Sequence, residues 1–200
     1  MIGIVDYEAG NIRSVANALA SIGVQYRISS DRDELAACDG IILPGVGAAP
    51  KAMESLDANG LPDFLRSFAK PFLGICLGME LLYERSEEGD TPCLGVIPGR
   101  VLRFNSTAVK IPHMGWNKVD TINPTPLLNK TGDAGYFYFA HSFYSAVDEY
   151  TTGITESGHP FSSSVNRRNY FGVQFHPEKS GDAGLALLKN FDALCRSSRQ

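Results

Sequence analysis

The residues best suited to chemistry are a cysteine between two glycines and a histidine next to a proline and a glutamate. From Pro71 to Leu82 the chain reads Pro-Phe-Leu-Gly-Ile-Cys-Leu-Gly-Met-Glu-Leu-Leu, so an apolar segment of strand type leads directly into Cys76. Gly-x-Cys-x-Gly is the thiol form of the nucleophile elbow, a tight strand-to-helix turn that exposes the reactive atom. Gly74 and Gly78 suit such a turn because a Cβ would obstruct it. We therefore expect Cys76 to be a nucleophile whose pKa is lowered by the helix start. The alternative is a buried structural cysteine.

A thiol nucleophile needs a base, and the base needs a group that orients it. Among the four histidines, His176 stands out because Pro177 and Glu178 follow it. Residues two apart project from the same side of an extended segment, and the proline stiffens their spacing. Glu178 can therefore accept a hydrogen bond from the imidazole nitrogen that faces away from the thiol. Together with Cys76 this motif predicts a Cys-His-Glu triad, although His-Pro-Glu alone is equally compatible with a surface turn.

Attack by a thiolate on an amide or ester places negative charge on oxygen, so donors must face that oxygen. The backbone N–H of Leu77, at the expected helix start, is one candidate. The turn 44–47, Pro-Gly-Val-Gly, supplies another, because its glycines allow a backbone N–H to face a ligand. The pattern Gly-x-x-x-x-Gly-Lys-Ser/Thr of a phosphate-binding loop is absent, since Lys51 follows Ala-Pro. A plain tight turn remains the alternative.

The elements that would position these residues begin with alternating strands and helices. The predicted strands are Ile2–Asp6, Val24–Ile28, Gly40–Leu43 and Pro71–Ile75, and the predicted helices are Ile12–Ile22, Asp31–Ala37, Lys51–Ala58 and Leu61–Ala69. Strands that are apolar on both faces and separated by helices favour a parallel α/β sheet. Ligands of such sheets bind at the carboxyl ends of the strands, where Asp6, the turn 44–47 and Cys76 all lie.

After Ser86 the pattern changes to short alternating segments separated by turn residues, which predict antiparallel or mixed strands. They are Arg100–Phe104, Lys118–Ile122, Tyr136–Phe139, Gly153–Glu156, Ser162–Asn166 and Tyr170–Gln174. A last helix, from about Asp182, carries Cys195 on its apolar face, which makes this cysteine structural. The sequence has no repeat, linker or low-complexity tract, so we expect a single domain over residues 1–200.

Composition excludes several classes of function. The 200 residues are 44% hydrophobic and 20% charged, as in a globular protein, and the formal net charge of -4 argues against nucleic acid as a partner. The four cysteines form no CxxC pair and no metal-type spacing with histidine, so we expect no metal and no cofactor. The apolar start is too short for a signal peptide, and no segment approaches the roughly 20 apolar residues of a membrane span. We expect a reduced, cytoplasmic protein with no membrane contact.

Gly-Ile-Cys-Leu-Gly-Met, the distant His-Pro-Glu and Pro-Gly-Val-Gly together resemble the class I glutamine amidotransferases of the triad type. Further blocks narrow the resemblance to the branch formed by the glutaminase subunits of imidazole glycerol phosphate synthase. These blocks are Asp6-Tyr7 with Gly10-Asn11, His-Met-Gly-Trp-Asn at 113–117, Tyr-Phe-Tyr-Phe-Ala-His-Ser at 136–142 and Phe-His-Pro-Glu-Lys-Ser at 175–180. The resemblance spans the chain from Asp6 to the last helix. It implies a mixed, mostly parallel central sheet flanked by helices, with added antiparallel strands in the second half.

The resemblance also implies a reaction. The chain would hydrolyse L-glutamine to glutamate and ammonia, and a separate (β/α)8-barrel cyclase subunit would use the ammonia in histidine biosynthesis, the two chains forming a heterodimer. Carried over by motif, Cys76 is the nucleophile, His176 the base and acid, and Glu178 its orienter. The other implied roles are oxyanion-hole amides at Val46 and Leu77, a substrate contact at Gly47, and contacts toward the cyclase at Trp116, Asn117, Tyr138 and Lys179.

One position departs from the family pattern. Glu80 stands four residues after the cysteine, where the family usually carries a glutamine that helps to hold the substrate. A carboxylate can hold the substrate ammonium, but it cannot donate a hydrogen bond, and its charge near Cys76 opposes thiolate formation. Two other interpretations remain open. One is a related enzyme, either a glutaminase for another synthase or a cysteine hydrolase that cuts γ-glutamyl bonds. The other is a non-catalytic binding module, against which the intact Cys76, His176 and Glu178 argue.

Overall fold

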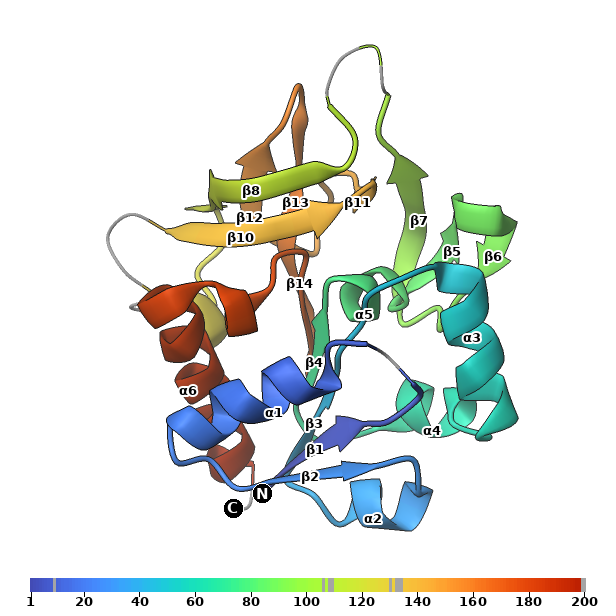
Figure 1. Cartoon of the computed structure of the whole chain (residues 1–200), viewed down its shortest axis with the longest axis vertical. Coiled ribbons are helices and arrows are strands. Elements are labelled where there is room, and N and C mark those ends of the chain that lie inside the picture. Colours follow the sequence, from blue (N-terminus) through green and yellow to red (C-terminus); the bar gives the residue numbers. More distant parts are fainter. Residues whose placement is uncertain (9, 106, 108–109, 130, 132–134, 199–200) are drawn as a thin grey trace.

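The computed structural model of the chain describes residues 1–8, 10–105, 107, 110–129, 131 and 135–198. Its main sheet has the strand order β2-β1-β3-β4-β14-β13-β11-β7-β5-β6, with β12 beside β13 and β9 beside β12. A separate antiparallel pair, β8 (His113–Lys118) and β10 (Tyr136–His141), runs across β12 and β13 in the view of Figure 1. The predicted fold class, a mixed α/β sheet flanked by helices, is confirmed.

The parallel half of the sheet comes mainly from the first part of the chain. Its strands are β2 (Tyr26–Ser29), β1 (Ile2–Val5), β3 (Gly40–Leu43), β4 (Phe72–Ile75) and β14 (Tyr170–Val173). Every residue of β1, β3, β4 and β14 is buried, which explains why the sequence of these strands is apolar on both faces. Because these strands are parallel, the ends of β3 and β4 lie at the same edge of the sheet.

Helices cover both faces of this half. They are α1 (Ile12–Ser21), α2 (Arg32–Ala36), α3 (Ala49–Ala58), α4 (Pro62–Ser67) and α6 (Gly181–Ser197). Figure 1 shows α1 and α6 on one side of the strands and α3 and α4 on the other. Gly23, with φ of 73°, ends α1 as predicted, and Asp31 caps α2 by accepting from the N–H groups of Asp33 and Glu34. Cys195 is buried on α6 against Gly40, in keeping with a structural role.

The second half of the sheet is largely antiparallel, as predicted. Its strands are β5 (Tyr83–Ser86), β6 (Thr91–Pro92), β7 (Ile97–Arg103), β9 (Asp120–Thr121), β11 (Phe143–Ser145), β12 (Thr151–Glu156) and β13 (Pro160–Arg167). Strands β5, β6, β8 and β11 were not predicted. In β8 the exposure alternates, and the exposed side chains are Met114, Trp116 and Lys118, so two large apolar side chains stand on the solvent side where polar ones are usual. In the described parts of the chain, no helix is both long and apolar enough to cross a membrane.

Candidate active site

Cys76 occupies a sharp turn between β4 and α5 (Leu77–Glu80). Its φ of 53° and ψ of -111° lie outside the regions that side-chain-bearing residues prefer, which stores strain at this residue. A hydrogen bond of 2.7 Å from its N–H to the carbonyl of Val173, on β14, holds it there. A Cβ on Gly74 would lie 2.5 Å from the carbonyl oxygen of Gly78, so the turn closes only with glycine at 74. The elbow is present, but the helix after it is a single turn, because β5 already begins at Tyr83.

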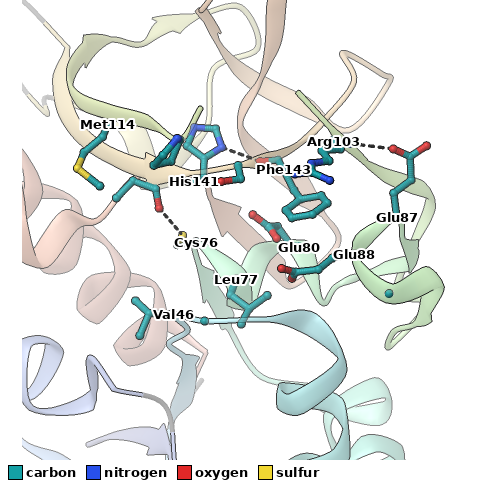
Figure 2. A pocket seen from close by; sticks show the side chains of 15 residues that line it. Val46, Cys76, Leu77, Glu80, Glu87, Glu88, Arg103, Met114, His141 and Phe143 are labelled. Atoms are coloured by element: carbon teal, nitrogen blue, oxygen red, sulfur yellow. Dashed lines mark hydrogen bonds between the residues drawn. The ribbon is translucent and has the colours of Figure 1, made fainter. Parts of the chain in front are cut away.

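A pocket of about 530 Å³ opens above the elbow (Figure 2). The predicted residues that line it are Val46, Gly47, Cys76, Leu77 and Glu80. The opposite wall consists of the segment 140–143, whose Ala140 carbonyl lies 4.0 Å from the sulfur of Cys76. The rest of the lining includes two further acids and a cation, and it consists of Glu87, Glu88, Gly89, Arg103, Pro112 and Met114. The structure therefore places Cys76, the turn after β3 and Glu80, where the family usually carries a glutamine, around one cavity.

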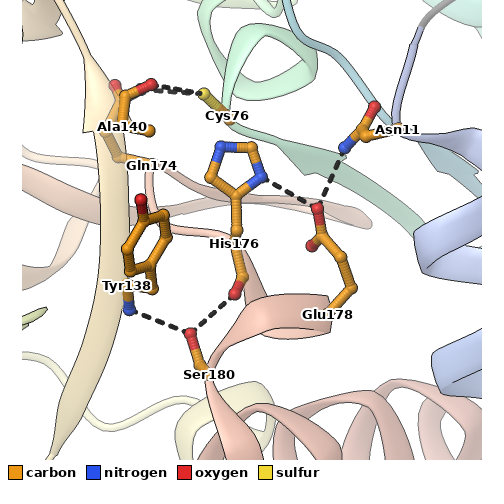
Figure 3. Close-up of polar contacts among 8 residues, drawn as sticks. All are labelled: Asn11, Cys76, Tyr138, Ala140, Gln174, His176, Glu178 and Ser180. Atoms are coloured by element: carbon orange, nitrogen blue, oxygen red, sulfur yellow. Dashed lines mark hydrogen bonds and ion pairs between the residues drawn. The ribbon is translucent and has the colours of Figure 1, made fainter. Parts of the chain in front are cut away.

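His176 and Glu178 lie beside this pocket rather than in its lining. In Figure 3 the imidazole ring of His176 lies between Cys76 and Glu178. Its Nδ1 is 2.9 Å from Oε1 of Glu178, and the amide of Asn11 donates to the same oxygen at 3.0 Å. Because an ionised carboxylate only accepts, Nδ1 carries the proton and Nε2 is left free for the thiol. The side chains of His176 and Glu178 are 1% and 0% exposed, so water competes little for this bond.

The backbone of His176 is fixed as well. Its N–H donates to the carbonyl of Tyr138 at 2.9 Å, and its own carbonyl accepts from the hydroxyl of Ser180 at 2.6 Å. The Ser180 oxygen in turn accepts from the N–H of Tyr138 at 3.0 Å. These three bonds hold the histidine against β10, and the two that Ser180 makes are drawn in Figure 3.

The electrostatics of Cys76 differ from the prediction. Burial raises the pKa of the thiol well above its ordinary value, and the carboxyls of Glu80 and Glu178 raise it further. The N–H of Leu77 and the amide of Gln174 lower the pKa, but they do not outweigh burial. The expected lowering of the pKa by the helix start is therefore wrong for this structure, because α5 is a single turn and the sulfur is enclosed. Cys76 rests as a thiol, and its proton must be removed as it reacts.

Glu80 is a second buried acid at the thiol. It is 5% exposed, and its Oε1 accepts from Nε2 of Gln174 at 2.8 Å. Burial raises the pKa of this carboxyl to about 8, with a further rise from Glu88 and an opposing effect of the Gln174 bond. At neutral pH Glu80 therefore holds a proton and can donate a hydrogen bond, which corrects the sequence-based statement that it cannot. While Glu80 holds this proton it adds little charge beside the thiol, and it raises the pKa of Cys76 only in its ionised form.

The turn 44–47 is anchored to the elbow. The hydroxyl of Tyr7 donates to the carbonyl of Pro44 at 2.6 Å, in a buried position. A Cβ on Gly45 would lie 2.7 Å from Cβ of Leu77, so glycine is required there by close approach rather than by its backbone angles. Gly47 has φ of 105° with open space around it, so its requirement is conformational. Val46 lies between them at the rim of the pocket.

Three of the residues assigned to a partner surface lie together. The ring edge of Trp116, on β8, meets the ring of Tyr138, on β10, with 6.3 Å between centroids. Nζ of Lys179 lies 5.8 Å from the centre of the Tyr138 ring. Trp116 is 57% exposed, and Met114 and Tyr136 are exposed beside it. We call the outer side of these two strands the hairpin face. Asn117 is not part of it, because its side chain points to the inner side of β8.

Sequence reasoning missed several residues that hold the site together. Asn11 orients Glu178, Gln174 bonds Glu80, and Tyr7 anchors Pro44. Glu88 lines the pocket and accepts from the N–H of Ala49 at 2.7 Å. For Gln174 the spacing could have been a signal, because it stands two residues before His176 at a strand end. Among the described residues, no cluster of three or more His, Cys, Asp or Glu side chains is arranged to hold a metal ion.

The chain is similar in sequence to a known protein family and to named relatives. A family model described as glutamine amidotransferase class-I matches residues 3–193. The imidazole glycerol phosphate synthase subunit HisH of Bacillus cereus is 47% identical over 199 residues, which cover 97% of this chain and 95% of the relative. The protein of the same name from Idiomarina loihiensis is 47% identical over 188 residues, with 94% and 95% of the two chains covered.

Solved structures share the fold at low sequence identity. One described as a glutamine amidotransferase has a TM-score of 0.76 at 18% identity, and 98% of each chain is covered. The structure of PurLQS from Thermotoga maritima has a TM-score of 0.69 at 19% identity, covering 96% of this chain and 97% of that one. At this level of identity the likeness concerns the fold alone.

Proposed function

Given that the chain belongs to the class I glutamine amidotransferase family, we propose that it is the glutaminase subunit of imidazole glycerol phosphate synthase. It hydrolyses L-glutamine to glutamate and ammonia and passes the ammonia to a (β/α)8-barrel cyclase subunit in histidine biosynthesis. The relatives named above support this role through 47% identity over nearly their whole length. The observation that carries the chemistry is the strained Cys76 at the pocket, with a buried imidazole oriented by Glu178 beside it.

The reaction begins with the side-chain amide of glutamine in the pocket. His176 takes the thiol proton on Nε2, and the sulfur of Cys76 attacks the amide carbon. The negative charge that develops on the carbonyl oxygen is met by the backbone N–H groups of Leu77 and Val46. His176 then gives its proton to the leaving ammonia, and a thioester between Cys76 and the glutamyl group remains. A water activated by the same imidazole hydrolyses this thioester.

Glu178 keeps the reactive histidine in one tautomer during these steps. Its oxygen accepts from Nδ1 of His176, so the free nitrogen is always Nε2, and Asn11 holds the carboxylate in place. Because the carboxylate is buried beside the ring, it also stabilises the imidazolium that forms when the thiol proton moves. The raised pKa of Cys76 makes this transfer necessary, since little thiolate exists before it.

Gly47 and Glu80 contact the substrate. The backbone at Gly47 has no Cβ to obstruct a ligand, and it lines the pocket. Glu80 holds a proton at rest, and the α-ammonium group of glutamine favours its ionised form, so substrate binding releases that proton. An ionised Glu80 then forms a charge-assisted contact with the ammonium.

The cyclase docks on the hairpin face and forms a heterodimer with this chain in the cytoplasm. Trp116 and the half-buried Tyr138 are aromatic residues of the kind enriched at protein interfaces, and Lys179 adds a cation beside the Tyr138 ring. Asn117 supports this surface from the inner side of β8, where its side chain donates to the carbonyl of Glu156 on β12. Residues 1–200 act as one domain in this assembly.

Hydrolysis is proposed to depend on the cyclase, because ammonia released without it is wasted. The turn 44–47 suits this control, since the peptide between Gly45 and Val46 can present either an N–H or a carbonyl to the oxyanion. Loss of one such donor costs about 2.7–4 kcal/mol, or roughly two to three decades in rate. Partner binding needs only to bias this rotation.

The test is glutaminase turnover of the chain alone, with the cyclase, and with the cyclase and its nucleotide ligand. We expect glutamine binding but very slow hydrolysis by the chain alone, and an increase in kcat that far exceeds the change in KM when both additions are made. Equal turnover in all three mixtures contradicts the control and favours a hydrolase that acts alone.

A further inference from the structure

Side chains of β8 and β10 form a continuous line of hydrogen bonds that ends in the pocket wall, which His141 helps to form. Nδ2 of Asn117 lies 3.2 Å from Nε2 of His113, and Nδ1 of His113 lies 2.9 Å from Nε2 of His141. Nδ1 of His141 lies 2.6 Å from the carbonyl oxygen of Phe143, a bond visible in Figure 2. We call this line the histidine chain. It uses none of the proposed triad residues.

Backbone groups fix the direction of every bond in the histidine chain. At one end, the Phe143 carbonyl can only accept, so His141 carries its proton on Nδ1 and accepts on Nε2. His113 must then donate from Nδ1 and accept on Nε2.

The other end leads to the same assignment. The side-chain oxygen of Asn117 accepts from the N–H of Lys118 at 2.8 Å, and its nitrogen donates to the carbonyl of Glu156 at 3.0 Å. Asn117 therefore presents its nitrogen, a donor, to His113. Both ends agree, and both rings are neutral Nδ1–H tautomers.

The surroundings of the two rings favour the neutral state. His141 is 5% exposed, and the rings of Phe104 and Phe161 lie 5.3 Å and 5.2 Å from it. The pKa of His141 is lowered to about 3, chiefly by burial and also by the neighbouring His113 and His176, against the opposing effect of the Phe143 bond. Burial also lowers the pKa of His113. A proton added to either ring would place two N–H groups face to face, so the chain holds only while both rings are neutral.

The histidine chain joins two parts of the molecule that matter for the proposed function. Its inner end holds the carbonyl of Phe143, in the pocket wall opposite Cys76. Its outer end is Asn117, the neighbour of the exposed Trp116 on the hairpin face, and His113 lies directly across from His141 in the strand pairing.

We propose that His113 and His141 are positioning residues, which hold the pocket wall 140–143 at a fixed place relative to β8. A partner that shifts β8 at Trp116 moves Asn117 with it, and through the rings of His113 and His141 it moves the pocket wall opposite Cys76. The kinetic part of this inference rests on the proposed function, whereas the hydrogen-bond pattern does not.

The first experiment reads the tautomers directly by nitrogen-15 NMR of the histidine rings in the unmodified chain. Imidazole nitrogens that carry a proton differ in chemical shift from those that do not, so each ring reports its own state. We expect His113 and His141 to be neutral Nδ1–H forms across the pH range of about 5 to 8. A neutral Nε2–H form, or a charged ring at either position within this range, overturns the proposal.

The second experiment measures glutaminase kinetics of His113→Phe in the assembled complex with the cyclase. Phenylalanine fills the aromatic cluster but leaves the buried Nε2 of His141 without its donor. This loss is expected to raise KM for glutamine by about tenfold, with kcat within about twofold, because the wall positions substrate without taking part in the chemistry. In the same variant His141 should keep its Nδ1–H form, because the Phe143 carbonyl still accepts from it, while the NMR signal of its Nε2 should shift because that nitrogen has lost its donor.

His159→Phe is the matched control. His159 packs against Phe104 and Tyr144 in the same aromatic cluster, and its buried Nε2 has no partner among the described residues. Its replacement should leave KM and the Nε2 signal of His141 unchanged. Equal effects of the two substitutions contradict a positioning role. If the unmodified complex shows no glutaminase activity, the proposed function fails, while the tautomer measurement still decides the hydrogen-bond pattern.

Discussion

Glu80→Gln separates the charge of a buried carboxyl from its shape. Glutamine has nearly the same volume, and its side-chain oxygen can still accept from Nε2 of Gln174, as Oε1 of Glu80 does at 2.8 Å. What the substitution removes is an acid whose pKa is raised by burial to about 8 from an ordinary value of 4.5. The change in stability should therefore depend on pH in a defined direction.

The sign follows from where the proton is held. Between pH 4.5 and about 8, folded Glu80 keeps a proton that the unfolded chain releases. The free energy of unfolding of the native protein therefore falls as pH rises, by about 1.4 kcal/mol per pH unit for this one group. Over the whole window the loss reaches up to about 5 kcal/mol, and above about pH 8 it stays constant. In Glu80→Gln the free energy of unfolding does not fall for this reason, because glutamine has no proton to release in this pH range.

The assay is urea unfolding of both proteins at about pH 5 and about pH 8. Other titrating groups are the same in both proteins, so they largely cancel in the difference. We expect a small difference at pH 5 and a gain of several kcal/mol for the variant at pH 8. The control is the same substitution at Glu54, which is exposed on α3 and should give no such trend. An equal difference at both pH values would mean that folded Glu80 is ionised throughout, and the argument for a proton-bearing acid would be refuted.

The remaining predictions concern the triad, the turn and the partner surface. His176→Ala and Cys76→Ala should reduce glutaminase turnover to similar extents, and the double variant should be little worse than either, because residues that act as a unit lose activity non-additively; a multiplicative loss contradicts this. Gly45→Ala should blunt activation by the cyclase, since its Cβ would press on Leu77, while gel filtration still shows the complex. Trp116→Ala should weaken cyclase binding by at least about tenfold in calorimetry, whereas Ile122→Ala, at another exposed apolar residue, should not; equal losses argue against the hairpin face.

Much of the fold was predictable because buried strands and helices have recognisable hydrophobic patterns in the sequence. Strands β1, β3 and β4 are apolar on both faces, and helical patterns separate them, so a parallel sheet with its site at the strand ends follows from pattern alone. The elbow could be predicted for a local reason as well, since Gly74 and Gly78 are needed for backbone approach within a few residues of Cys76.

What could not be predicted depends on contacts between distant segments. Asn11 reaches Glu178 across 167 residues of sequence, and no local pattern reports that contact. The pKa of Cys76 rises because the fold encloses it near Glu80 and Glu178, whereas the local helix start argued for the opposite direction. Strand β8 escaped prediction because its apolar side chains face outward, as the hairpin face requires.

The role of Cys76 in the proposed reaction can be tested by comparing nitrogen sources for Cys76→Ala assembled with the cyclase. Only the glutaminase half needs the thiol, so formation of imidazole glycerol phosphate from glutamine should be abolished while formation from added ammonium salts continues at the rate of the unmodified complex. Retained ammonia-driven synthesis also shows that the variant folds and assembles. Normal glutamine-driven turnover by Cys76→Ala would contradict the assignment of Cys76 as the nucleophile and, with it, the proposed reaction.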